Sequence, residues 1–219
     1  MATQRAIPIE DIDSAQNINI DSSFMAHPRA CIILDSQDVT FTNASGSTVA
    51  IQFVLNALNP DLNQQIFSDI PSLPSGPMPS APQTPDNLTN GNGSVNYYVV
   101  VGGASYGPYC IQVGDGPMQV LFTLSGDTIT CTPDPVAIPP YNLALQIAGT
   151  IAMYPDDANN DYSIQWPGGD PFTPPLSTPD GASHGDSASS VPQDYSYTVT
   201  SPNPADGGSG GGTVKIKTS

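Results

Sequence analysis

The feature that most constrains the fold is a repeat of about 112 residues. Residues Val39–Asn43 alternate apolar and polar side chains, and a short loop leads from them into Val49–Phe53, which ends Ile-Gln-Phe. The same order recurs where Ile151–Pro155 leads into Tyr162–Trp166, which ends Ile-Gln-Trp. Solenoid repeats have periods of about 20–50 residues, whereas this spacing is that of a whole domain. The repeat therefore predicts two tandem β domains of one ancestry.

The closing segments of the two copies also correspond. Val95–Val99 and Ile111–Val113 in the first copy match Tyr195–Val199 and Val214–Ile216 in the second. No long stretch shows the period of an amphipathic helix, and many short alternating segments between turn residues indicate a sandwich or barrel. We predict an all-β chain of two Greek-key β-sandwich domains with long Pro/Gly-rich loops. The expected parts are an N-terminal arm (1–28), a first domain (29–132) and a second domain (133–219).

The charge balance excludes two classes of partner. Four Lys and Arg residues oppose 20 Asp and Glu residues, so the formal net charge is −16. Binding to nucleic acid or to an anionic membrane needs a basic surface, which four cations cannot build. The chain has no apolar run of transmembrane length, and no signal peptide is visible near its N-terminus. Its polar residues are mainly uncharged, as in exported proteins, so we expect an extracellular or particle-associated location.

Turn residues and prolines refine the expected sheets. Asn43–Gly46 predicts a β-hairpin between the Val39 and Val49 segments, and the second copy predicts another. Met118–Leu124 and Thr128–Thr132 predict a further hairpin. Six prolines between positions 71 and 85 cannot enter a sheet interior, because proline lacks the N–H donor. A polyproline-like surface strap and a mobile loop both fit this insertion.

The strand pattern resembles that of cupredoxin-like domains and, more broadly, of immunoglobulin-like sandwiches. The resemblance rests on the Val39 and Val49 segments, a later Tyr-x-Tyr-x-Val and a final Gly-x-Val-x-Ile, and it covers about two-thirds of the chain. Copper-carrying members of the family have a His just after the hairpin turn, and a Cys, a second His and usually a Met near the last strand. Here Thr48-Val49 and Asp161-Tyr162 follow the two turns, and Cys110 and Met118 have no His between them. The resemblance therefore implies the sandwich without type 1 copper, and we expect no cofactor.

One acidic cluster is a candidate metal site. Asp156, Asp157 and Asp161 lie in a single predicted turn that also contains two Asn residues. Carboxylate and amide oxygens are the ligands that Ca²⁺ prefers, although the spacing is not that of an EF-hand loop. The same residues are also common turn formers, so a plain turn is the alternative.

The remaining reactive or aromatic side chains fit structural roles better than chemical ones. His27 lies at the edge of the N-terminal arm, far from His184 in a Gly/Ser-rich predicted loop, and Ser183, His184 and Asp186 are local neighbours rather than a converging triad. The three cysteines can form one disulfide with a spare thiol, or they can be three buried free thiols. The aromatic residues can pack in a core or line a sugar-binding face; they are Tyr97, Tyr98, Tyr106, Tyr109 and Trp166.

These observations favour a non-enzymatic structural subunit that assembles with itself, as in a filament, sheath, surface layer or virion. The arm carries Ile7, Ile9, Ile18 and Ile20 outside the repeat, so we expect it to add a strand to a neighbouring copy and to make few contacts with its own domains. Deletion of residues 2–25 should then leave a folded protein that no longer assembles. The alternative is a secreted sandwich that binds carbohydrate or Ca²⁺, and a copper electron carrier is a third.

Overall fold

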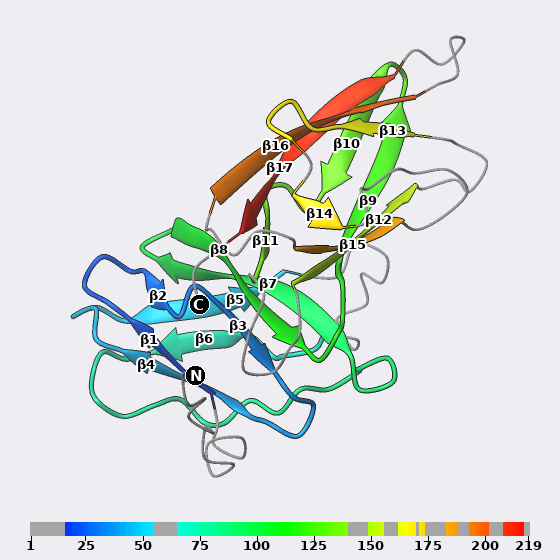
Figure 1. The fold of residues 1–219 in the computed structure, drawn as a ribbon. Helices are drawn as coiled ribbons and strands as arrows, with labels where there is room; N and C mark the ends of the chain where they lie inside the picture. The colour runs from blue at the N-terminus through cyan, green and yellow to red at the C-terminus, as the bar shows by residue number, and fades with distance from the viewer. Residues whose placement is uncertain are drawn as a thin grey trace, which may run out of the picture.

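The structure is a computed structural model that describes residues 16–54, 65–139, 149–155, 162–169, 171–173, 183–187, 193–201 and 208–216. Within these ranges the chain has seventeen strands and no helix, which confirms the prediction of an all-β protein. Figure 1 shows the first eight strands in one lobe and the later strands in another. We refer to these as the first half (β1–β8) and the second half (β9–β17).

The first half consists of two sheets that enclose a core. One sheet has the order β2-β1-β4 and the other β3-β8-β7-β5-β6. The core between them includes Ile18, Phe41, Ile51 and Tyr97, all 0% exposed. The strands are β1 (Gln16–Ile20), β2 (Ala26–His27), β3 (Ala30–Ile33), β4 (Val39–Asn43), β5 (Val49–Phe53), β6 (Ile70–Leu73), β7 (Gly93–Val101) and β8 (Ala104–Val113).

In the second half the described strands are hydrogen-bonded into one continuous sheet. The order is β13-β16-β17-β10-β9-β12-β15-β14, and β11 pairs with β17. Its core includes Val120, Phe122, Met153 and Val199, all 0% exposed. The strands are β9 (Met118–Ser125), β10 (Thr128–Thr132), β11 (Val136–Ile138), β12 (Thr150–Pro155), β13 (Ser163–Gln165), β14 (Phe172–Thr173), β15 (Ser183–Ser187), β16 (Gln193–Thr200) and β17 (Ser209–Ile216).

The two halves pair their strands with the same registers. The parallel pair β1–β4 sets Ile18 opposite Phe41, and the parallel pair β9–β12 sets Val120 opposite Met153. The antiparallel pair β5–β7 sets Ile51 opposite Val99, and β13–β16 sets Ile164 opposite Val199. Strands β3 and β11 run parallel to β8 and β17 in the same way. The sequence repeat thus corresponds to a repeated pattern of strand pairing.

The hairpins expected inside the repeat are wrong. Strands β4 and β5 belong to different sheets, and β12 and β13 are likewise not paired with each other. Residues 44–48 instead cross between the two sheets, so both strands turn their apolar side chains to one core. The buried Asn43 side chain holds this crossing: its Nδ2 donates to the carbonyls of Ser47 (2.7 Å) and Leu73 (2.8 Å). The hairpin predicted for β9 and β10 is confirmed.

The expectation that the N-terminal arm makes few contacts with its own domain is wrong for residues 16–28. Strand β1 is hydrogen-bonded to β4, and Ile18 and Ile20 are fully buried in the first core. They alternate with polar residues and therefore supply one apolar face to a strand next to β4. Ile7 and Ile9 lie outside the described residues.

The expected boundary at residue 132 does not follow the packing. Strands β9 and β10, which we assigned to the first domain, pair with β12 and β17 and contribute Met118, Phe122 and Cys131 to the second core. The chain passes from one half to the other at residues 114–117. Gly114 N donates to the Ile33 carbonyl (2.8 Å) and Asp115 N to Asn92 Oδ1 (2.8 Å), so the connection is held against the first half.

The proline-rich insertion includes a surface strap that runs along the edge of β4 that is not paired with β1. Val39 and Gln83 exchange two backbone hydrogen bonds of 2.9 and 2.8 Å, and Ser80 N donates to the Phe41 carbonyl (2.7 Å). Ser80 Oγ accepts from Phe41 N (3.0 Å), so the segment satisfies the edge of β4 without forming a regular strand. Of the two conformations that fitted the sequence, the structure has the strap.

Candidate functional site

The clearest candidate site in the described residues is the junction between the two halves, where buried polar side chains form hydrogen bonds. Asn96, on the outward face of β7, is 1% exposed. Its Nδ2 donates to the Ala137 carbonyl (2.8 Å), and its Oδ1 accepts from Ala137 N (2.9 Å). The amide thus pairs with β11 as a neighbouring strand would, and it satisfies both backbone groups of a buried residue.

A second buried amide joins the halves from β8. Gln112 is 0% exposed, and its Oε1 accepts from Thr150 N at the start of β12 (3.0 Å). Its Nε2 donates to the Gly114 carbonyl (2.9 Å). Ala30 and Cys110 lie beside these amides on the same sheet face and pack into the second core. The first half therefore supplies both apolar surface and directional hydrogen bonds to the second half.

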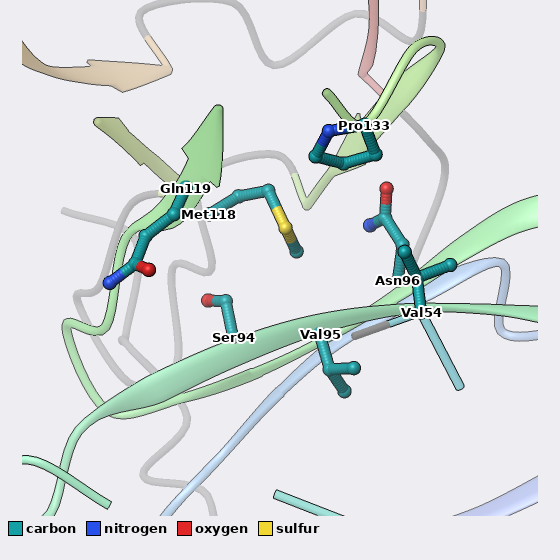
Figure 2. Close-up of a pocket in the computed structure, with 7 residues that line it drawn as sticks. All are labelled: Val54, Ser94, Val95, Asn96, Met118, Gln119 and Pro133. Atoms are coloured by element: carbon teal, nitrogen blue, oxygen red, sulfur yellow. The ribbon is translucent and has the colours of Figure 1, made fainter. Parts of the chain in front are cut away.

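A small cavity of about 20 Å³ lies within this junction. Figure 2 shows Ser94 and Asn96 pointing from β7 toward Met118 and Pro133, whereas Val95 points the other way. This volume suits about one water molecule and is far below that of a small-molecule site. Its role in the molecule is therefore structural.

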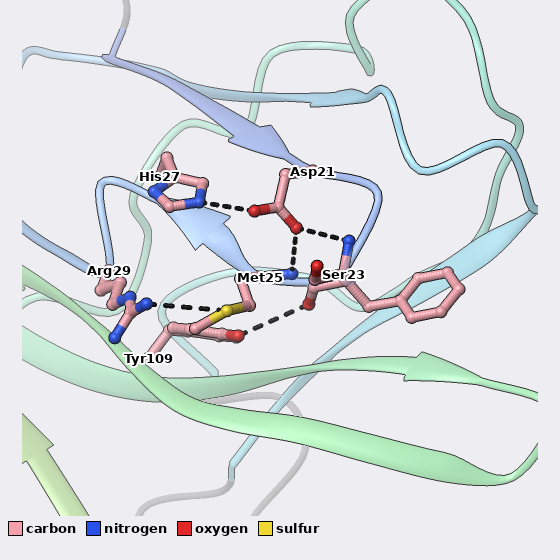
Figure 3. A network of polar contacts seen from close by, with 7 residues as sticks. Asp21, Ser23, Met25, His27, Arg29 and Tyr109 are labelled. Atoms are coloured by element: carbon pink, nitrogen blue, oxygen red, sulfur yellow. Dashed lines mark hydrogen bonds and ion pairs between the residues drawn. The ribbon is translucent and has the colours of Figure 1, made fainter.

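A polar network surrounds the turn between β1 and β2 (Figure 3). Asp21 Oδ1 accepts from the backbone N–H groups of Ser23 (2.8 Å) and Met25 (3.0 Å), and Asp21 Oδ2 lies 2.9 Å from His27 Nε2. These contacts, the Met25 hydrogen bond first, hold the pKa of the Asp21 carboxyl below its usual value. The arrangement is that of an Asx turn that orders a surface loop. The carboxylate and imidazole are used to fix this turn.

The structure places the predicted metal and triad residues as follows. Asp156, Asp157 and Asp161, the candidate Ca²⁺ ligands, lie outside the described residues. His184 lies in β15, opposite Ala152, and not in the loop that we expected. His27 lies in β2 of the first half, opposite Asn19, and its ring contacts Asp21. In the described part of the chain, no three His, Cys, Asp or Glu residues lie close enough to hold a metal ion together.

All three cysteines are free thiols buried in the structure, which settles the alternatives left open by their number. Cys31 and Cys110 occupy successive register positions on adjacent strands, so Cys31 enters the first core and Cys110 the second. Burial raises the pKa of the Cys31 thiol to about 12 and also raises the pKa values of Cys110 and Cys131. The thiols behave as small apolar side chains.

The five aromatic residues do not form one sugar-binding face. Tyr97 and Tyr109 are buried in the first core, and Tyr106 packs on Phe24 with ring centroids 5.2 Å apart. Trp166 packs against the second core. Tyr98 differs, because it is partly exposed and lines an open cleft on the outer face of β5 and β7.

Comparison with known proteins adds little. No family model matches the chain, and no curated protein matches it. Among solved structures, the bradyzoite-specific antigen BSR4 of Toxoplasma gondii is similar over 99% of this chain and 92% of its own, with 10% sequence identity and a TM-score of 0.25. At that TM-score the likeness supports no inference. No helix in the described ranges is long and apolar enough to cross a membrane.

Proposed function

We propose that the protein is a non-enzymatic structural subunit made of two tandem Greek-key β-sandwich domains of cupredoxin or immunoglobulin type. Support for the tandem interpretation comes from the equivalent registers of β1–β4 with β9–β12 and of β5–β7 with β13–β16. On this interpretation the first domain is residues 16–113 and the second is residues 118–216. The cupredoxin-like resemblance then describes the shell of each domain.

The observation that carries the structural role is the junction. The Asn96–Ala137 hydrogen bonds are buried and the Gln112–Thr150 hydrogen bond is partly buried, so relative movement of the halves would expose or break them. An unpaired buried amide or peptide group costs about 1–3 kcal/mol, which disfavours hinge motion. A subunit that must hold a fixed shape in an assembly needs such a junction, whereas a protein that closes around a ligand needs a mobile one.

Self-assembly is the second part of the proposal, now limited to residues 1–15. Within the described residues β13 pairs only with β16, whereas its counterpart β5 pairs with both β7 and β6. The edge of β13 therefore suits an added strand from a neighbouring copy, and Ile7 and Ile9 would supply its apolar side chains. Homopolymers of this kind fit the extracellular or particle-associated location that the composition favours.

The test measures oligomeric state by light scattering and negative-stain imaging of the full chain. We expect oligomers or filaments that Ile7→Asp/Ile9→Asp abolishes, because carboxylates at these two positions cannot be buried against a sheet as the isoleucine side chains can. The matched control, Ala2→Asp/Ala6→Asp, adds the same charges to the same segment and should assemble normally. A full-length protein that is monomeric at high concentration would contradict the proposal.

A further inference from the structure

The cleft beside Tyr98 carries an inference that goes beyond a structural role. Its volume is about 450 Å³, within the usual range for a small-molecule site. The cleft is lined by residues at and just after the end of β5, and by one residue each of β7 and β8: Gln52, Phe53, Val54, Tyr98 and Ser105. Gln52 and Tyr98 are opposite each other in the β5–β7 register, so an amide and an aromatic ring lie side by side on one sheet face.

A β-bulge positions the Tyr98 ring. The register between β7 and β8 shifts between Tyr97 and Val99, where β8 has an additional residue near Gly107. Gly107 has a φ of 142°, and a Cβ there would lie 3.0 Å from Tyr98 Cδ1 and 3.0 Å from the Tyr97 carbonyl oxygen. The absence of a side chain at Gly107 thus lets the ring lie close to the backbone. Bulges commonly redirect a side chain in this way beside binding sites.

The polar groups of the cleft define the chemistry of a ligand. Burial raises the pKa of the Tyr98 phenol, and the negative charge of Asp134 in the second half adds to this rise, so the phenol stays a neutral hydrogen-bond donor. The nearby Lys215 is bound to Asp194 at 2.8 Å. With a net charge of −16 and its neighbouring cation already paired, the cleft disfavours anions. A partly exposed aromatic ring beside an amide and a hydroxyl group suits a neutral molecule with an apolar face and several hydroxyl groups.

We propose that this cleft binds a neutral oligosaccharide, with one sugar ring stacked on Tyr98 and its hydroxyl groups hydrogen-bonded by Gln52 and Ser105. The site lies on the first half at its border with the second half, so the fixed junction would also fix the shape of the cleft. Such a site would let a structural subunit attach to a neutral glycan surface.

The experiment titrates ¹⁵N-labelled full-length protein with cellohexaose, maltohexaose, xylohexaose and chitohexaose, and follows backbone and Gln side-chain amide signals by NMR. We expect at least one of these to shift the signals of Gln52, Tyr98 and Ser105. Tyr98→Ala should weaken binding by about tenfold or more. Tyr98→Phe should lose less, because it keeps the ring. The matched control is Tyr106→Ala, whose ring packs on Phe24 on the other face of the sheet and whose removal should leave the affinity unchanged.

Three results would overturn the proposal. The first is that no neutral hexasaccharide shifts these signals at millimolar concentration. The second is that a sugar binds but that neither Tyr98→Ala nor Gln52→Ala, a substitution at an exposed position, changes its affinity, which would place the ligand elsewhere. The third is that a heparin hexasaccharide binds more tightly than the neutral sugars, which would contradict the charge argument. The dispersion of the NMR spectrum of each variant shows whether it is folded.

Discussion

Removal of the Asn96 side chain amide is the most direct test of how the two halves are held together. In Asn96→Ala, the N–H and carbonyl of Ala137 lose their partners at a position where both residues are buried. Each orphaned group costs about 1–3 kcal/mol, so the loss of both partners should lower the free energy of unfolding by about 2–6 kcal/mol. Domains of this size are stable by about 5–15 kcal/mol, so the effect is a large fraction of the total.

The assay is urea unfolding followed by the fluorescence of Trp166, the single tryptophan of the chain, and by circular dichroism. Trp166 packs against the second core and reports on that half, whereas circular dichroism reports on both. We expect coincident transitions in the wild type and separate ones in Asn96→Ala. The control is Asn17→Ala, which also removes two hydrogen bonds, from Thr40 and Thr42, but on the exposed surface. Equal losses for Asn96→Ala and Asn17→Ala, or a loss below about 1 kcal/mol for Asn96→Ala, would refute the reasoning.

Three further predictions follow from the same structure. Ile18→Ala or Ile20→Ala should cost about 2–5 kcal/mol in urea unfolding, and deletion of residues 2–25 should unfold the first half, whereas deletion of 2–15 should not. The three buried thiols should resist a disulfide reagent at pH 8 in the native protein and all react in urea; rapid native labelling of Cys31 would contradict its burial. Asp21→Asn should reduce stability at pH 7, because the hydrogen bonds of the turn favour the charged carboxylate. The difference from wild type should shrink as the pH falls through the lowered folded pKa, where wild-type Asp21 becomes protonated and loses this stabilisation. A difference that grows on acidification would contradict the assigned turn.

Alternation in the sequence identified which side chains are buried but not which strands pair. Phe41, Ile51 and Met153 are core residues, as the repeat indicated. The same pattern also suggested a hairpin, because two alternating segments around a turn-forming Asn look alike whether the strands pair or cross between sheets. What distinguishes the two cases is the buried Asn43 side chain, whose partner Leu73 lies in another strand. Because Asn43 and Leu73 are 30 residues apart, the sequence around Asn43 does not reveal this hydrogen bond.

The boundary and the junction were harder to predict, for a related reason. Prolines at 133 and 135 suggested a hinge, but these residues join β10 to β11 within the second half. Asn96 and Gln112 alternate with core residues, and polar residues in that position are typical of a solvated face. Burial of that face depends on packing between the halves, which periodicity within one strand cannot reveal. A local hint is that both residues are uncharged amides in strands that contain no charged residue.

The long insertions after β5 and β13 have one physical role despite their different sequences. In the first half the strap around Ser80 hydrogen-bonds the outer edge of β4, and in the second half β15 pairs with the corresponding edge of β12. An open edge beside a core strand would leave peptide groups unsatisfied and invite unregulated pairing with other chains. The prolines of the strap add a further barrier, since they offer no N–H groups to a next strand. If the protein assembles through strand addition, the edges of β4 and β12 are therefore closed to it, and the partner must approach an edge such as that of β13.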